Sequence, residues 1–251
     1  MITRNKTHRF WNEIRYLLSL IFLTGVLTSW SVMAQEKPFV MSTSVGAPLY
    51  IEDGSGLFNL LVAEIFRRLN IDYVLIHQPA QRAIISTNNG SVDGTTPRAA
   101  AIEKNQHNII RIPQDIFNFE YMAYTKDPSI KIKDWSSLKP YTVGIINGWK
   151  IIEKNVSGAK SVTKANYLDQ LFTLLDLGRV DIAILDRVMG NWELKQLGLN
   201  FITIEPPLLE KLNYIYVHKR HKNLVHDINQ TVIEMKKDGT YKAIYIKALS
   251  N

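Results

Sequence analysis

The chain has 251 residues, a formal net charge of +7 and no cysteine. Without cysteine it has no disulfides and cannot be a lipoprotein anchored through an N-terminal cysteine. The positive charge is mild, and its densest run, Lys-Arg-His-Lys at 219–222, is better explained by a solvated helix start than by nucleic acid. We therefore expect no nucleic-acid partner.

The first 34 residues have the pattern of a secretory signal peptide. Four basic residues precede or flank the almost wholly apolar stretch 17–27, and Val32-Met33-Ala34 offers residues that a signal peptidase reads. Cleavage after Ala34 would release a soluble periplasmic chain, residues 35–251, with a charge of about +4. The alternative is an uncleaved membrane anchor, for which the apolar stretch is short.

Strand-like and helix-like segments alternate along the first half of the mature chain. Runs of β-prone residues predict strands at 39–44, 73–77, 92–96, 109–112 and 119–125. Apolar residues at helical spacing predict a helix at 57–69, and Pro79 opens another that ends near residue 89. Asp127-Pro128 breaks the pattern, and we expect the chain to enter a second lobe there.

The second half repeats this alternation. Strands are expected at 142–146, 182–185, 201–204 and 214–217. Helices are expected from Gly148-Trp149-Lys150 onward, at 167–177, at 187–197, over the stripe from Leu224 to Met235, and at 241–248. The strand at 214–217 returns to the first lobe. We therefore expect an α/β fold with largely parallel sheets, lobe 1 at 35–126 and 215–251, lobe 2 at 127–214, and two crossing segments that act as a hinge.

One short pattern occurs twice. Asn89-Gly90-Ser91-Val92-Asp93 and Leu177-Gly178-Arg179-Val180-Asp181 each place a glycine and then x-Val-Asp between a helical stretch and a strand-like run. Glycine is common just past a helix C-terminus because the left-handed conformation costs it little. The repetition indicates two similar lobes, and a cleft between lobes is where small molecules bind.

Several segments, in their order and spacing, resemble a known family. They are 56–69, 89–93, 142–148, 178–186 and 237–240. The chain resembles the bacterial extracellular solute-binding proteins of family 3, which have the two-lobed type II periplasmic-binding, or Venus-flytrap, fold and bind amino acids and related polar solutes.

This resemblance implies a role for two charged residues. The family aspartate that holds the ligand's α-amino group matches Asp186, and the nearest candidate for the arginine that holds the α-carboxylate is Arg98, which comes earlier after Asp93 than the family arginine does. The places of the family's ligand-stacking aromatics fall near Gly46 and Ala80, neither of which is aromatic.

The residues themselves leave alternatives open for these two candidates. Asp186 can pair an ammonium group in the cleft or act as the N-cap of the helix that follows it. Arg98 follows Thr95 and Thr96, and a guanidinium beside hydroxyl groups suits a carboxylate; the alternative is a surface arginine paired with an acid such as Glu103.

Further ligand-binding candidates lie in three other segments. In the turn at 148–150, Trp149 can stack on a ligand and Lys150 can add charge, or Trp149 can simply pack. Arg82, at the start of a lobe 1 helix, can reach the ligand or remain an exposed helical arginine. Tyr50 can replace the missing aromatic near Gly46 or pack on its own lobe.

No motif indicates catalysis or a cofactor. The chain has no Gly-x-Ser-x-Gly elbow and no Gly-rich phosphate loop, and His218, His221 and His226 fit no tight zinc motif. We expect a monomer, not an enzyme, that captures a small polar, amino-acid-like solute for an ABC-transporter permease of the inner membrane. The alternatives are a ligand-sensing receptor for a membrane signalling protein and a dehydratase-like enzyme on the same fold.

Overall fold

The computed structural model describes residues 37–249, so the predicted signal peptide and its cleavage site lie outside the described residues. The chain divides into a unit of residues 1–37 and a unit of residues 38–251, and only the second is considered below. No helix in the described range is long and apolar enough to cross a membrane.

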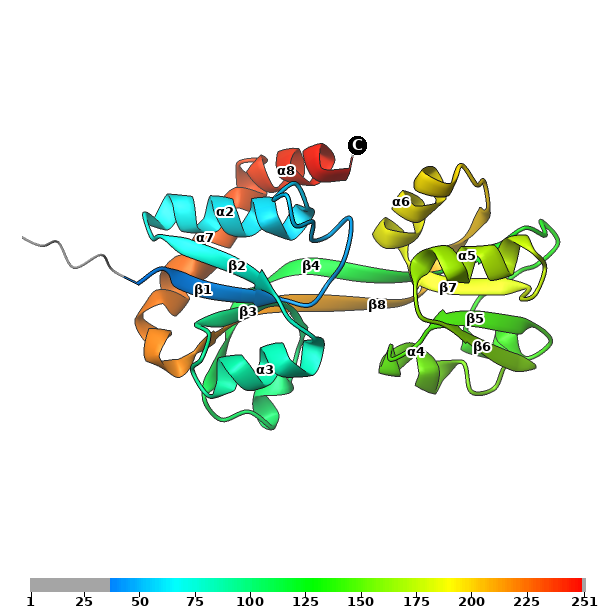
Figure 1. The fold of residues 1–251 in the computed structure, drawn as a ribbon, viewed down its shortest axis with the longest axis horizontal. Helices are drawn as coiled ribbons and strands as arrows, with labels where there is room; N and C mark the ends of the chain where they lie inside the picture. The colour runs from blue at the N-terminus through cyan, green and yellow to red at the C-terminus, as the bar shows by residue number, and fades with distance from the viewer. Residues whose placement is uncertain (1–36, 250–251) are drawn as a thin grey trace, which may run out of the picture. The chain divides into compact units, whose positions relative to one another are not determined.

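A single mixed sheet of eight strands runs through this unit, in the order β2-β1-β3-β8-β4-β7-β5-β6 (Figure 1). The strands are β1 Phe39–Thr43, β2 Tyr73–His77, β3 Gly94–Ala99, β4 Ile109–Thr125, β5 Thr142–Ile146, β6 Ser161–Ala165, β7 Ile182–Asp186 and β8 Ile202–His218. The α-helices are α2 Leu57–Leu69, α3 Ala80–Asn88, α4 Lys150–Asn155, α5 Leu168–Asp176, α6 Arg187–Leu197, α7 Val225–Lys237 and α8 Thr240–Leu249. The short 3₁₀ helices within residues 37–249 are η1 Ile102–Lys104, η2 Trp135–Leu138 and η3 Lys219–Leu224.

The sheet has two halves with the same plan. In one half β1 pairs in parallel with β2 and β3, and in the other β5 pairs in parallel with β6 and β7. Each half then joins one long strand antiparallel to it, β8 beside β3 and β4 beside β7. We call the half with α2, α3, α7 and α8 lobe 1, and the half with α4, α5 and α6 lobe 2. The exact lobe boundaries stay a prediction.

Two long antiparallel strands connect the halves, and here the expectations from sequence were wrong. The segments 109–112 and 119–125 form one strand, β4, and 201–204 and 214–217 are joined within β8; the two strands run side by side in Figure 1. Register shifts after Arg111 and after Tyr121 let β4 and β8 remain paired across stretches whose apolar pattern is interrupted. The sheet is therefore mixed rather than largely parallel.

The aspartate of the repeated x-Val-Asp pattern makes the same pair of hydrogen bonds in both lobes. Asp93 accepts the Val40 N–H through its carboxylate at 2.8 Å and donates its own N–H to the Val40 carbonyl at 2.8 Å. Asp181 does the same with Thr142, at 2.7 and 2.9 Å. These hydrogen bonds therefore hold the start of β3 against β1, and the start of β7 against β5.

Apolar faces of the helices complete the core. In α2 the buried residues Phe58, Leu61, Val62 and Ile65 recur at helical spacing, and the helix packs against α7 and α8. The C-terminal helices thus return to lobe 1, as Figure 1 shows. A second cluster in lobe 2 gathers Val143, Ile145, Ile182 and Ile184 from β5 and β7.

Candidate functional site

Arg98 and Asp186 stand at corresponding places in the two lobes. Each lies five positions after the aspartate of the repeated pattern, at the carboxyl end of β3 or β7. Arg98 lies opposite Tyr214 of β8, and Asp186 lies opposite Tyr121 of β4. Ligands of open α/β sheets bind at the carboxyl ends of strands, so both residues are at the place where a ligand is expected.

Arg98 is buried, and two of its three guanidinium nitrogens make no hydrogen bond to the described residues. The residue is 8% exposed, and Nη1 donates to the Ser44 hydroxyl at 2.6 Å. Its Nε and Nη2 atoms are buried and have no hydrogen-bond partner within residues 37–249. Burial lowers the pKa of Arg98 to about 10, which leaves it charged at neutral pH. The alternative considered for Arg98, a surface arginine paired with Glu103, is not observed: Arg98 is buried, and Glu103 accepts from Tyr216 and faces Arg111.

The unused edge of Arg98 has the geometry that receives a carboxylate. Nε and Nη2 point their N–H groups in the same direction and form the two-pronged fork that binds both oxygens of one carboxylate. The same protein shows this pairing on its surface, where Nε and Nη2 of Arg67 bind the two oxygens of Glu64 at 2.7 and 2.8 Å. Ser44 occupies the other side of Arg98 and fixes the direction of the fork.

Further uncharged polar groups lie at or near the ends of the neighbouring strands β1, β2 and β3. Their buried oxygens have no hydrogen-bond partner in the part of the chain that the structure describes: Thr43, Thr95 and Thr96 Oγ1, and Gln78 Oε1. Thr43 ends β1, Gln78 follows β2 and donates its N–H to the Thr43 carbonyl at 2.8 Å, and the other two lie on β3. Buried polar atoms are nearly always hydrogen-bonded, so a cluster of exceptions needs an explanation. We call Thr43, Ser44, Gln78, Thr95, Thr96 and Arg98 the Arg98 site.

Asp186 differs from Arg98 in that both of its side-chain oxygens already accept hydrogen bonds from the protein. It is fully buried, and Oδ1 accepts the N–H groups of Val188 and Met189 at 3.0 and 3.1 Å. Oδ2 accepts the Glu120 N–H at 3.2 Å. The N-cap role, one of the two alternatives left open for Asp186, is therefore confirmed for α6, and the ligand-binding alternative stays a prediction. Burial, outweighing these hydrogen bonds, raises the pKa of Asp186 to about 6.

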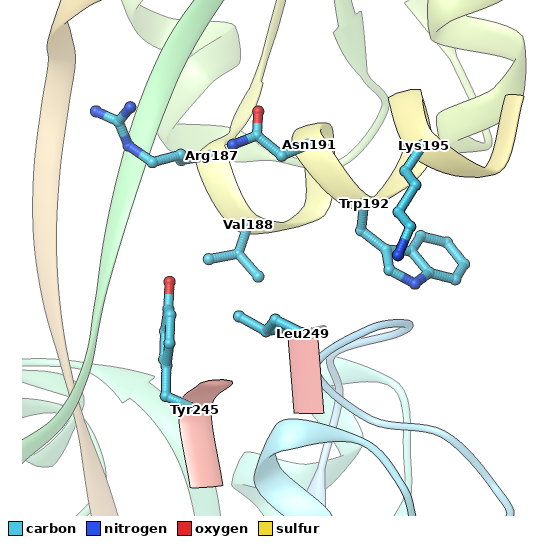
Figure 2. A pocket seen from close by; sticks show the side chains of 7 residues that line it. All are labelled: Arg187, Val188, Asn191, Trp192, Lys195, Tyr245 and Leu249. Atoms are coloured by element: carbon cyan, nitrogen blue, oxygen red, sulfur yellow. The ribbon is translucent and has the colours of Figure 1, made fainter. Parts of the chain in front are cut away.

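A charged network and a groove lie next to Asp186. Arg187 binds Glu120 of β4 and Glu205 of β8, the latter at 2.6 Å. A cavity of about 250 Å³ is lined by Arg187, Val188, Asn191, Trp192 and Lys195 of α6 and by Tyr245 and Leu249 of α8. Figure 2 shows Tyr245 and Leu249 facing Val188 across it. The guanidinium of this groove is engaged by two carboxylates, unlike that of Arg98.

The predicted turn of lobe 2 lies at the carboxyl end of β5. Gly148, at φ 86°, donates its N–H to Glu153 at 3.0 Å, and Lys150 and Lys164 bind the same carboxylate at 2.9 and 3.0 Å. These partners, Lys150 first, lower the pKa of Glu153 to about 2. Trp149 is half-buried and packs edge-on against Tyr121 with ring centroids 5.9 Å apart.

Two further candidates lie outside the Arg98 site. Arg82 is exposed on α3, which agrees with the exposed helical arginine considered as its alternative. Tyr50 is half-buried and stacks on His77 with centroids 5.4 Å apart, so it packs on its own lobe. Within the described residues no hydrogen bond or ion pair joins Arg98 to either of them, or to Trp149. Of the predicted residues, the structure brings together Thr95, Thr96 and Arg98.

Sequence reasoning did not identify Thr43, Ser44 and Gln78. The first two close the predicted strand at 39–44, and the rule that ligands gather at the carboxyl ends of parallel strands would have drawn attention to them. The histidines are placed differently: His221 contacts the Asp93 carboxylate at 2.6 Å, beside Arg220. Among residues 37–249, no group of three or more His, Asp or Glu side chains could hold a metal ion.

Comparison with known proteins identifies the fold. No protein-family model matches the chain. An uncharacterized protein of Shewanella oneidensis is 28% identical over 174 residues, which are 65% of each chain, so this chain spans just under two thirds of that relative's length.

Solved structures match over most of the described residues. The ligand-binding core of GluR0 in complex with L-glutamate has a TM-score of 0.74 at 14% identity and covers 86% of this chain and 99% of that one. A histidine kinase sensor domain similar to periplasmic binding proteins has a TM-score of 0.68 at 16% identity (85% and 96% covered). The substrate-binding protein of an amino acid ABC transporter has a TM-score of 0.65 at 18% identity (86% and 100%).

An ancestral amino-acid-binding protein, described as a precursor of cyclohexadienyl dehydratase, has a TM-score of 0.66 at 16% identity and covers 84% of this chain and 95% of that one. All these identities are low, so the likenesses establish the fold. The protein has the two-lobed fold of periplasmic-binding proteins.

Proposed function

We propose that this protein is a family 3 type solute-binding protein of the periplasm, which captures a small polar, amino-acid-like solute between its two lobes. The observation that carries the proposal is the unpartnered Nε–Nη2 edge of Arg98. A buried guanidinium without a counter-charge costs free energy in the absence of a ligand, and a bound carboxylate would remove that cost. The proteins of the same fold include binders of amino acids and of glutamate.

The second lobe supplies the other half of the site in this proposal. Trp149 and Lys150 at the end of β5, and Asp186 at the end of β7, are the lobe 2 candidates. A ligand that contacts both lobes binds the closed arrangement more tightly than the open one, and so it shifts the population toward closure. A membrane partner would then read the closed form.

The partner we propose first is an ABC-transporter permease, because one protein of this fold serves an amino acid ABC transporter. A membrane sensor is the second candidate, because another is the sensor domain of a histidine kinase. A crosslinking experiment in membranes distinguishes them: ligand-dependent crosslinks to a permease favour transport, and crosslinks to a kinase favour signalling.

We propose binding without turnover. The precursor of cyclohexadienyl dehydratase shows that the fold is compatible with an enzyme lineage. The distinguishing measurement is the recovery of the ligand after prolonged incubation, since a binding protein returns its ligand unchanged.

The direct test of capture is a thermal-shift screen. The purified protein is refolded to remove carried ligand and screened against amino acids, organic acids, polyamines and short peptides. A ligand at 100 times its Kd adds about 2.7 kcal/mol, which is on the order of 5–10 °C in Tm. The shift should disappear in Arg98→Gln and persist in Arg67→Gln, whose exposed guanidinium binds Glu64 in the same fork. No shift with any class of solute would contradict the proposed function.

A further inference from the structure

A groove on lobe 1 shares no residue with the Arg98 site. It has a volume of about 370 Å³ and lies between the start of β4, the 3₁₀ helix η3 and the start of α7. Its lining residues are Ile110, Pro113, Lys222, Val225, His226 and Asn229, and we call it the basic groove. We propose that the basic groove docks an acidic peptide segment of a partner protein, in which carboxylates flank an apolar side chain. This second surface does not depend on the capture of a solute.

The first step concerns the distribution of positive charge along the chain. Residues 219–247 contain seven lysines and arginines but three acidic residues, and so account for the whole charge of about +4 of the predicted mature chain. Arg220 is balanced by the carboxylate of Asp93. Lys219 and Lys222 are exposed, and neither has an ion pair among the described residues. The surface around η3 therefore has positive charge that the protein does not neutralise.

The second step concerns the anchoring of η3, which presents these lysines. Arg220 and His221 both contact the largely buried carboxylate of Asp93, His221 at 2.6 Å. The Lys219 N–H donates to the Asn108 carbonyl at 2.7 Å. The backbone of η3 is thus held in place before any partner binds, and docking has little ordering of this segment to pay.

The third step concerns the apolar part of the groove. Ile110, Pro113 and Val225 supply its apolar side chains. The Gln114 N–H donates to the side-chain oxygen of Asn229 at 2.8 Å, which holds this part of β4 against α7. A preformed concave surface of apolar groups beside an unpaired lysine suits an apolar side chain with a carboxylate next to it.

The fourth step concerns nearby carboxylates, none of which lines the groove. Asp115 follows Pro113 on β4, but it pairs with Lys236 at 2.6 Å. Asp227 comes one position after His226, and consecutive residues of a helix are about 100° apart around its axis, so Asp227 lies on another side of α7. A carboxylate of a partner therefore meets lysines at this groove without competing acidic groups of the protein.

The experiment maps short blocked peptides onto the purified protein by amide chemical-shift perturbation in NMR. The first peptide contains leucine flanked by glutamates, the second has glutamine in place of glutamate, and the third has serine in place of leucine. We expect the first peptide to give saturable shifts at residues 110–114 and 219–229, and the other two to bind about 10-fold more weakly or not at all. No shifts with the first peptide, or shifts confined to other residues, would overturn the inference.

Two charge reversals locate the effect. Lys222→Glu should weaken the first peptide about 10-fold or more, because it places a negative charge in the groove. The matched control is Lys242→Glu, which makes the same change in charge at an exposed position of α8, beyond the opposite end of α7. The control should change the affinity less than about 3-fold, because salt screens exposed charges at that separation. Equal losses in the two variants would mean that net charge, and not the groove, attracts the peptide, and would overturn the inference.

A membrane surface is the other anionic occupant to test. Sedimentation with vesicles of phosphatidylglycerol and phosphatidylethanolamine should recover the wild type and Lys222→Glu equally. If the wild type sediments with the vesicles, Lys222→Glu does not, and the peptide gives no shifts, the groove binds a membrane and the inference is wrong. None of these outcomes changes the thermal-shift result for a solute, so the proposed function stands or falls separately.

Discussion

Arg98 and Asp186 occupy equivalent positions in the two halves of the sheet, each opposite a tyrosine of a long strand, Tyr214 or Tyr121. The halves share one backbone plan, set by the paired hydrogen bonds of Asp93 and Asp181. The chemistry at the two strand ends nevertheless differs. In lobe 1 a buried guanidinium has two nitrogens without a hydrogen-bond partner among the described residues, and in lobe 2 a carboxylate caps a helix.

Replacing Arg98 by methionine should separate stability from binding. The variant removes a buried charge without a counter-ion and keeps much of the side-chain volume, so the free energy of unfolding of the ligand-free protein should rise by about 1 to 3 kcal/mol. Ligand binding should be lost in the same protein. Urea denaturation and calorimetry measure the two effects.

The matched control for this prediction is Arg67→Met. Arg67 is exposed and paired with Glu64, so its replacement should change stability by less than about 1 kcal/mol and leave binding intact. A large loss of stability in Arg98→Met would mean that Arg98 is structural and would argue against a ligand role.

The two repeated aspartates should differ in their importance for stability. Asp93→Ala removes a mostly buried carboxylate that contacts Arg220 and His221 and accepts the Val40 N–H, and it should cost about 3 kcal/mol. Asp181→Ala, at an exposed position, removes hydrogen bonds to Thr142 only and should cost about 1 kcal/mol. Equal losses in urea denaturation would contradict this ranking.

Asp93 should also contribute to acid denaturation. Burial alone would raise the pKa of Asp93, but hydrogen bonds from Val40, Arg220 and His221 outweigh it and hold the pKa below its ordinary 3.8. A lowered pKa in the folded state means that the stabilisation is present above about pH 4 and is lost as the pH falls through the folded pKa. The stability difference between the wild type and Asp93→Asn should therefore shrink between pH 5 and pH 3. A difference that does not change over this range would refute the assignment.

Asp186 should act in the opposite direction. Its pKa is raised from 3.8 to about 6 by burial, so the folded state retains a proton that the unfolded state has released. Its contribution to the free energy of unfolding therefore falls as the pH rises from about 4 to about 6, by on the order of 2 to 3 kcal/mol. Stability curves of Asp186→Asn should lack this decline. If the wild type and the variant show parallel curves from pH 4 to pH 7.5, Asp186 does not titrate as described.

Close packing between β1, β3 and β8 makes Gly94 intolerant of a side chain. A Cβ at this position would lie 2.5 Å from Met41 Sδ and 2.8 Å from the Tyr216 carbonyl oxygen. Gly94→Ala should therefore destabilise lobe 1 by about 1 to 3 kcal/mol. Gly158→Ala, where nothing lies within 4 Å, serves as the control and should be close to neutral in thermal denaturation.

The predictable part of the fold lies where local pattern and tertiary structure agree. The helix at 57–69 and the strands at 73–77 and 142–146 match the structure. Most apolar residues of 57–69 and 142–146 are buried, whereas 73–77 has no fully buried residue and pairs in parallel with β1. The long strands β4 and β8 were not predictable as continuous elements. Polar and proline residues such as Pro113 and Glu205-Pro206 interrupt their apolar pattern, and it is pairing between the two strands that keeps them extended.

The site was predictable only in part for a related reason. Arg98, Thr95 and Thr96 are contiguous in sequence, so their proximity could be inferred directly. Thr43 and Gln78 join them only because parallel pairing brings three strand ends together. The hydrogen bond from the Glu120 N–H to Asp186 depends on the register of β4 against β7, and local sequence does not specify that register.

The most direct measurement is a crystal structure of the protein with its bound solute. If Arg98 binds the solute, the two oxygens of a ligand carboxylate should lie about 3 Å from its Nε and Nη2 atoms. A ligand bound in the groove between α6 and α8, without contact to Nε or Nη2 of Arg98, would contradict this role of Arg98.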